Sequence, residues 1–84
     1  MNTGQYSFAI SYYSLLIILE PTNNYAYFQL AKAYGFHDNQ KEALNALVKA
    51  KETGFNNKKA VQNEPAFEKL RANKRFNILL AEMK

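Results

Sequence analysis

The sequence predicts an all-α fold, and two observations carry that prediction. Apolar residues recur every three to four positions along most of the chain, which is the spacing of one face of a helix. The residues that interrupt helices most strongly are few and leave segments of helix length between them: Gly4, Pro21, Gly35, Gly54 and Pro65. No segment shows sustained two-residue alternation with β-branched residues, so nothing in the pattern predicts a sheet.

The 84-residue chain has the size of one small domain, and 48% of its residues are hydrophobic, as in an ordinary globular protein. The absence of cysteine excludes a disulfide framework, a thiolate metal cluster and a cysteine nucleophile. No run approaches the roughly 18 to 20 apolar residues of a membrane span, and the first residues lack the Lys or Arg of a secretory signal. We therefore expect a soluble protein without a cofactor, with the cytoplasm as its default location.

The first expected helix covers residues 6–19 and carries two apolar stripes. One stripe contains Tyr6, Ala9, Tyr13 and Leu16, and the other contains Phe8, Tyr12, Leu15 and Leu19. Two stripes predict a helix that is buried on two sides.

Two further helices are expected between Pro21 and Gly54. The second covers residues 24 to about 36 and ends at Gly35 and the polar residues that follow. In the third, Asn39 is placed as N-cap with Glu42 three residues later, the spacing of a capping box in which each side chain bonds the other residue's backbone N–H. Gly54 provides a left-handed stop for this helix. The buried stripe of the third helix is Ala43, Leu44, Leu47 and Ala50.

Beyond Gly54 the expected elements are shorter, because Pro65 suits the first turn of a helix but not its interior. We expect one turn of helix at residues 57–62, another at 65–71, and a last helix capped by Asn73. The apolar positions of the last helix are Phe76, Leu79, Leu80 and Met83.

The chain also carries an internal repeat. A shift of 34 residues aligns Ala9 with Ala43, Ile10 with Leu44, Tyr13 with Leu47 and Asn23 with Asn57. On these spacings the chain resembles the tetratricopeptide repeat family, whose unit is a 34-residue helix-turn-helix. Tyr27, Leu30, Ala31 and Tyr34 match the first helix of such a unit, and Ala43, Leu47 and Ala50 match the second. The departures are Asp38, where Gly is common in the turn, and Phe55, where Pro usually starts the next unit.

The resemblance implies a helical solenoid of about one and a half repeats with a short helical C-terminal cap. Residues 1–84 form one domain, divided into a half repeat (4–23), a full repeat (24–57) and the cap (58–84). The cap is similar to the ending of many bacterial members of the family in Glu64, Pro65, Phe67, Leu70, Arg71, Arg75 and Phe76, although Lys74 stands where a second Pro is frequent. A chain that opens inside a repeat looks like a fragment of a longer array or one that borrows its missing helix from a neighbour.

Members of such a family act in protein–protein interaction, so the resemblance implies a scaffold or adaptor that binds a peptide or partner helix without catalysis. The first helix of a repeat builds the concave face of the solenoid, which here gives a predicted groove of Tyr25, Phe28, Gln29, Lys32 and Phe36. The alternative for Phe28 and Phe36 is burial under the cap. Chaperone-binding members use a Lys and an Asn where this chain has Phe28 and Lys32, so we do not expect recognition of a chaperone tail.

The sequence contains no constellation of catalytic residues. His37, the only histidine, lies in a polar turn without metal-ligand spacing around it. Glu64 and Glu68 lie four residues apart, but carboxylates next to Pro65 are typical of a helix's first turn. We expect no enzymatic activity.

The basic residues of the C-terminal third give the alternative function, the binding of nucleic acid or an acidic ligand. They are Lys58, Lys59, Lys69, Arg71, Lys74 and Arg75. The competing interpretation is a solvated cap in which Arg71 and Arg75 bind Glu64, Glu68 or the carbonyls at helix C-termini. It makes nucleic acid the less expected partner. A third possibility is a chain that only terminates an array.

The second stripe of the first helix, Phe8, Tyr12, Leu15 and Leu19, has no preceding helix to cover it. We expect it to self-associate as a homodimer or to pack on an upstream domain. The last helix could fold over it instead, but a solenoid places the two helices at opposite ends.

Overall fold

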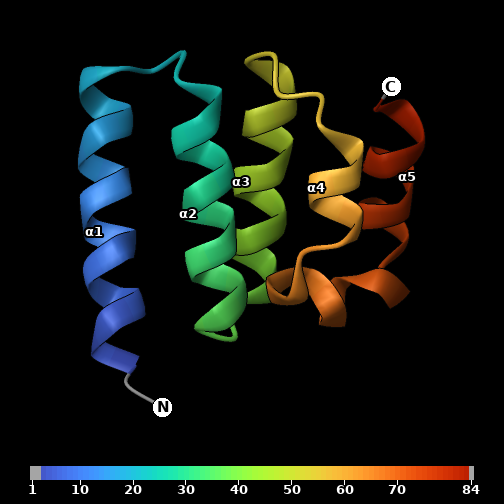
Figure 1. The fold of residues 1–84 in the computed structure, drawn as a ribbon, viewed down its shortest axis with the longest axis horizontal. Helices are drawn as coiled ribbons and strands as arrows, with labels where there is room; N and C mark the ends of the chain where they lie inside the picture. Colours follow the sequence, from blue (N-terminus) through green and yellow to red (C-terminus); the bar gives the residue numbers. More distant parts are fainter. Residues whose placement is uncertain (1–2, 84) are drawn as a thin grey trace.

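The computed structural model describes residues 3–83 and confirms the all-α prediction. Its helices are α1 (Thr3–Leu19), α2 (Asn24–Phe36), α3 (Gln40–Glu52), α4 (Lys58–Gln62), the 3-10 helix η1 (Pro65–Ala72) and α5 (Lys74–Glu82). Within this described part of the chain there is no strand. Figure 1 shows α1, α2 and α3 side by side, with α4 and α5 following on the far side of α3 and η1 at the lower end.

The three longest helices form an antiparallel row in which α2 packs against both α1 and α3. Alanines make the close approach of α2 and α3 possible, because their small side chains leave room for the two backbones to lie near each other. Ala31 on α2 and Ala43 and Ala46 on α3 belong to one buried cluster. Ala26 and Ala33 on α2 and Ala50 on α3 are also buried. The expected small positions of the third helix, Ala43 and Ala50, are thus in the core.

Four helices begin in the same way, with an asparagine as N-cap. The side-chain oxygen of the asparagine accepts a hydrogen bond from the backbone N–H three residues later, in the pairs Asn23–Ala26, Asn39–Glu42, Asn57–Ala60 and Asn73–Phe76, with N···O distances of 3.1, 3.3, 3.1 and 3.2 Å. Each bond satisfies one of the free N–H groups at a helix start. The caps predicted at Asn39 and Asn73 are confirmed.

Only one of the two hydrogen bonds of the predicted capping box forms at the start of α3, the one from the Glu42 backbone N–H to the Asn39 side chain. The backbone N–H of Asn39 donates to the carbonyl of Tyr34 at 2.9 Å, so it has a partner before Glu42 can reach it. The carboxylate of Glu42 instead accepts from the side-chain amide of Asn45 at 3.3 Å. The tight turn between α2 and α3 therefore takes the place of the reciprocal bond.

The two turns that flank α3 use left-handed backbone. Gly54, with φ 111°, follows the end of α3 and provides the predicted left-handed stop. Asp38, with φ 63°, takes the same region in the turn between α2 and α3, which explains why glycine suits this position. An aspartate tolerates the conformation better than most residues.

The second helix ends at Phe36, as predicted, and Gly35 lies in its last turn. A Cβ at this position would clash with the backbone carbonyl of Ala66 in η1. The missing side chain therefore allows the last turn of α2 to lie directly against η1. Gly4, expected to interrupt helical structure, also lies inside a helix, because α1 already begins at Thr3.

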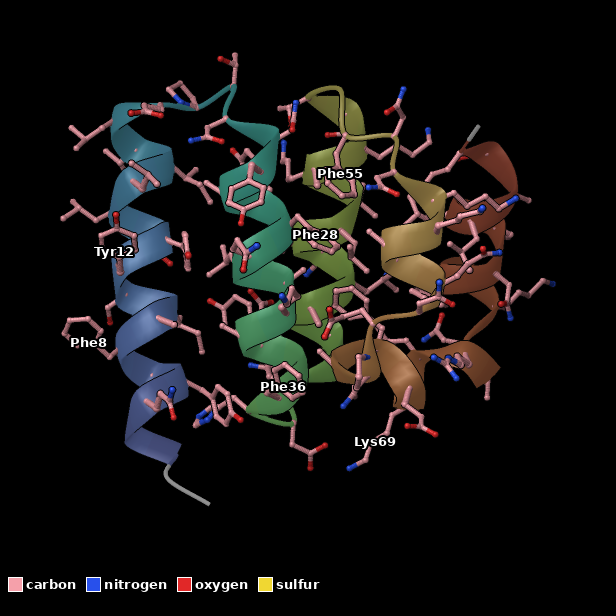
Figure 2. The ribbon with its side chains drawn as sticks, in the orientation of Figure 1. Phe8, Tyr12, Phe28, Phe36, Phe55 and Lys69 are labelled. Carbon is pink, nitrogen blue, oxygen red and sulfur yellow. The ribbon has the colours of Figure 1, made fainter. Side chains whose placement is uncertain are left out.

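The core lies between α2, α3 and the C-terminal elements. Its most fully buried large side chains are Phe67, Phe76, Leu70 and Val61. Phe28 stacks on Phe55 with ring centroids 4.5 Å apart and meets Phe67 edge-on at 6.0 Å. Figure 2 shows Phe28 and Phe55 turned into this core, so the C-terminal segment packs against the α2–α3 pair.

The first helix is covered on one side only. Ile10, Tyr13 and Ile17 are partly buried and pack toward the core, while the stripe that contains Phe8 and Leu15 is exposed. The expectation of a helix buried on two sides is therefore wrong for α1, because no element in the described part of the chain lies beyond it (Figure 1).

Candidate functional site

The predicted groove residues on α2 divide between the surface and the core. Gln29, Lys32 and Phe36 line a common hollow, and Tyr25 is exposed on the same side of α2, one turn before Gln29. Phe28 is only 6% exposed and so is not available to a partner. The prediction fails at this position because Phe28 lies on the flank of α2 that faces Phe55 and η1, and burial there was the alternative that the sequence left open.

The hollow lies between α1 and α2 and has a volume of about 210 Å³. We call it the α1–α2 groove; it is lined by Gln5, Tyr6, Ala9, Tyr13, Gln29, Lys32, Ala33 and Phe36. At one end Tyr6 stacks on Phe36, with ring centroids 5.4 Å apart and an angle of 22° between the rings. The stacking leaves Phe36 39% exposed, so this ring forms part of the wall and is not buried under the cap.

The sequence analysis missed the wall that α1 contributes. Tyr6, Ala9 and Tyr13 were identified only as a buried stripe, although the same three side chains line the α1–α2 groove. The signal was present, because two of these three residues are tyrosines, whose hydroxyl groups favour the edge of a core over its interior.

Lys32 is the only charged residue among the eight that line the α1–α2 groove. Its ammonium group lies 3.6 Å from a carboxylate oxygen of Glu64 and 5.8 Å from the centre of the Phe28 ring. The Lys32 side chain keeps 29% of its surface exposed. A partly exposed ion pair of this length is weak, so a carboxylate in the groove could compete for the ammonium group.

The surface has other hollows besides this groove. One of about 230 Å³ between α3 and α5 is lined by Val48, Lys51, Glu52, Arg75, Ile78, Leu79 and Glu82. Its charges already meet each other, since Lys51 lies 3.4 Å from Glu82. This hollow presents charges of both signs to a partner, whereas the α1–α2 groove has Lys32 as its one charged residue.

The basic residues of the C-terminal third are spread over several elements. Lys58 and Lys59 begin α4 at the upper end of the molecule in Figure 1, whereas Lys69 lies at the lower end (Figure 2). Lys69 pairs with Asp38 at 2.7 Å, and Arg71 donates to the carbonyl of Gln62 at 3.0 Å. Lys74 and Arg75 begin α5, and Arg75 lines the α3–α5 hollow. Arg71 thus bonds the carbonyl of the last residue of α4, a helix C-terminal carbonyl as expected, while Glu64 is paired with Lys32.

The Asp38–Lys69 pair is the clearest electrostatic contact of the molecule. The hydrogen bond from the Lys69 ammonium group holds the pKa of Asp38 below its ordinary value, with smaller contributions from the Gln40 amide and from the Lys69 charge. Because Asp38 sits in the α2–α3 turn and Lys69 in η1, the pair links two segments that are distant in sequence.

Within residues 3–83, no group of three or more His, Cys, Asp or Glu side chains is placed to hold a metal ion. His37 follows the end of α2, where its backbone N–H caps the helix and its side chain is exposed. In the same described part of the chain, no helix has the length and apolar character needed to cross a membrane.

The residues predicted to self-associate, Phe8, Tyr12, Leu15 and Leu19, are all exposed on α1. Figure 2 shows Phe8 pointing away from α2. The structure adds Ile18, which the sequence analysis did not include, to the same exposed side. Comparison with protein-family models, curated proteins and solved structures found no match to this chain.

Proposed function

We propose that this chain is a non-catalytic protein-binding module, a scaffold or adaptor built as a tetratricopeptide-like helical repeat with a C-terminal cap. The antiparallel α2–α3 pair, its buried alanines and the left-handed turn at Asp38 support the repeat architecture. The packing of η1 on both α2 and α3, with α5 against η1, supports the interpretation of residues 58–83 as a cap.

The observation that carries the proposal is the α1–α2 groove. Aromatic rings and small residues line it, and exposed aromatic surface is typical of sites that bind protein segments. Lys32 adds a single cation, so the ligand that fits best has an apolar anchor next to a carboxylate. We therefore assign the groove to an acidic, partly apolar segment of a partner protein.

A titration tests this assignment. A short peptide with a Leu-Phe anchor flanked by Asp and Glu should shift the backbone NMR resonances of Gln29 and Ala33, and a peptide with Lys in place of the acids should not. Lys32→Gln should weaken binding of the acidic peptide about fivefold, as expected for the loss of ~1 kcal/mol from one partly exposed ion pair. Lys41→Gln is the matched control, because Lys41 is exposed on α3 and does not line the groove. Equal binding of both peptides, or an equal effect of both substitutions, would contradict the assignment.

The alternative function, binding of nucleic acid or an acidic ligand through the C-terminal basic residues, has less support. Its six cations lie on three elements, and two of them are engaged within the chain. Salt dependence separates the alternatives, because the release of several counterions from a nucleic acid weakens binding steeply as salt rises. Affinity for an apolar anchor with one carboxylate changes little over the same range.

A further inference from the structure

The outer side of α1 is the largest exposed apolar surface of the described chain. Five of the eight large hydrophobic side chains that are exposed belong to this helix, with exposed fractions between 56% and 75%: Phe8, Tyr12, Leu15, Ile18 and Leu19. No charged residue lies between Thr3 and Leu19. A contiguous apolar surface on a helix is normally covered, so this surface is expected to have a cover.

The spacing of this surface indicates what covers it. Phe8, Tyr12, Leu15 and Leu19 follow one another at intervals of four, three and four residues, which is the heptad spacing of the a and d positions of a coiled coil. Such a seam packs against another helix with the same spacing. A second copy of α1 provides that helix without any further partner.

We propose that the outer side of α1 is the interface of a symmetric homodimer in which the two α1 helices pair antiparallel. This inference does not rest on the α1–α2 groove, which lies on a different flank of α1. In the antiparallel pair, Phe8 lies opposite Leu19 of the second copy and Tyr12 lies opposite Leu15.

The sizes of the side chains favour the antiparallel direction. The two aromatic residues occupy the first half of the seam and the two leucines the second half. Antiparallel pairing places each ring against a smaller side chain, so the layers along the seam have similar volumes. Parallel pairing would crowd four rings at one end and would also align the two helix dipoles, which repel each other in that arrangement.

The available area is sufficient for a dimer of moderate affinity. An aromatic side chain can bury on the order of 200 Å² of surface. The five exposed side chains together expose roughly 600 Å² of surface per copy. Two copies then bury about 1,200 Å², the lower limit for a stable specific interface. An interface at this lower limit predicts a weak, reversible dimer, so we expect a dissociation constant in the micromolar range.

The distribution of charge is compatible with this pairing. The basic excess of the chain lies in residues 57–84, whose described elements α4, η1 and α5 are on the far side of α3 from α1 (Figure 1). When two copies meet through α1, their basic ends point away from each other. Dimerisation therefore brings no like charges together, although each copy carries a net charge of +4.

Light scattering over a concentration series tests the proposal. The wild-type chain should have twice the monomer mass at about 200 µM and approach the monomer mass near 2 µM. Leu15→Glu and Ile18→Glu should each remain monomeric at the higher concentration, with circular dichroism spectra like that of the wild type because both side chains are already exposed. Ile78→Glu is the matched control, since Ile78 is 49% exposed on α5, and it should stay dimeric. A wild-type monomer at the higher concentration overturns the proposal, as does a dimer that survives both substitutions on α1.

Cross-linking tests the direction of the helices, and the absence of native cysteine makes it specific. Phe8 and Leu19 are eleven residues apart, which is about 16 Å along a helix. In the antiparallel dimer, Phe8→Cys and Leu19→Cys chains should form disulfides with each other when mixed, but neither should do so alone. Disulfides within each variant alone would show parallel helices and overturn this part of the proposal.

Discussion

The replacement of Gly35 by alanine isolates a contact that holds the C-terminal segment against α2. The added Cβ would lie 3.0 Å from the carbonyl carbon of Ala66 and 3.1 Å from the Cβ of Ala66. It would lie closer still to the carbonyl oxygen of Ala66. Carbon atoms in contact normally lie about 3.5–4.0 Å apart. To accommodate the methyl group, η1 has to move away from α2 by roughly 1 Å.

This movement costs packing because η1 carries two of the most buried side chains of the molecule, Phe67 and Leu70. An extra methyl group in a packed core costs about 1–3 kcal/mol, and the obstacle here is backbone, which places Gly35→Ala near the upper end. Alanine at the same time favours the helix by about 1 kcal/mol over glycine. The expected net loss is about 2 kcal/mol, or a fall in the melting temperature of roughly 8–16 °C for a domain of this size.

Urea unfolding followed by circular dichroism measures this difference. The pair Asn45→Gly and Asn45→Ala, at an exposed position in α3, gives the helix-propensity contribution in the same protein. The double substitution Gly35→Ala with Ala66→Gly should not restore stability, because the carbonyl of residue 66 remains in place. The reasoning is refuted if Gly35→Ala is as stable as the wild type. It is also refuted if Gly35→Ala is more stable by the difference in unfolding free energy between Asn45→Ala and Asn45→Gly.

Two further predictions concern the turns and caps. Because the folded-state pKa of Asp38 is lowered mainly by its hydrogen bond from Lys69, its carboxylate contributes stability above its unfolded pKa and loses that contribution as pH falls through the folded value. The urea concentration at half-unfolding should therefore fall less steeply below about pH 4 in Asp38→Asn than in the wild type. An equally steep fall in both proteins would contradict this. Asn57→Ala should lower the free energy of unfolding in urea by about 1 kcal/mol, because it removes the N-cap of α4. Asn45→Ala removes no cap and should be nearly neutral. Equal effects of the two substitutions would argue against the cap.

The helix boundaries could be predicted from the sequence because the interactions that fix them are local. Asn39 and Asn73 bond backbone groups only three residues away, so the residue type and its position next to an apolar pattern were sufficient evidence. The left-handed stop at Gly54 is equally local, because it depends on the backbone of one residue. A prediction from spacing succeeds where the contact lies within one helical turn.

The errors and omissions concern residues whose role is set by distant segments. Gly35 has the sequence pattern of a helix end, yet its constraint is a carbonyl 31 residues later in the chain. Phe28 lies at the edge of the predicted groove face of α2, and only the paths of Phe55 and η1 decide that its ring is covered. Helical periodicity gives the direction of a side chain from its own axis, but not which element lies in that direction.

The same limit explains why the sequence does not separate the three sides of α1. Ile10 and Ile17 pack toward the core, Tyr6 lines the α1–α2 groove, and Phe8 and Leu15 form the exposed seam. All are apolar or aromatic, so composition cannot distinguish them, but their directions around the helix differ. A substitution on the seam should therefore change the mass of the particle without changing peptide affinity, whereas Lys32→Gln should do the reverse. If Leu15→Glu abolishes both, the groove is complete only in the dimer, and the two surfaces act as one site.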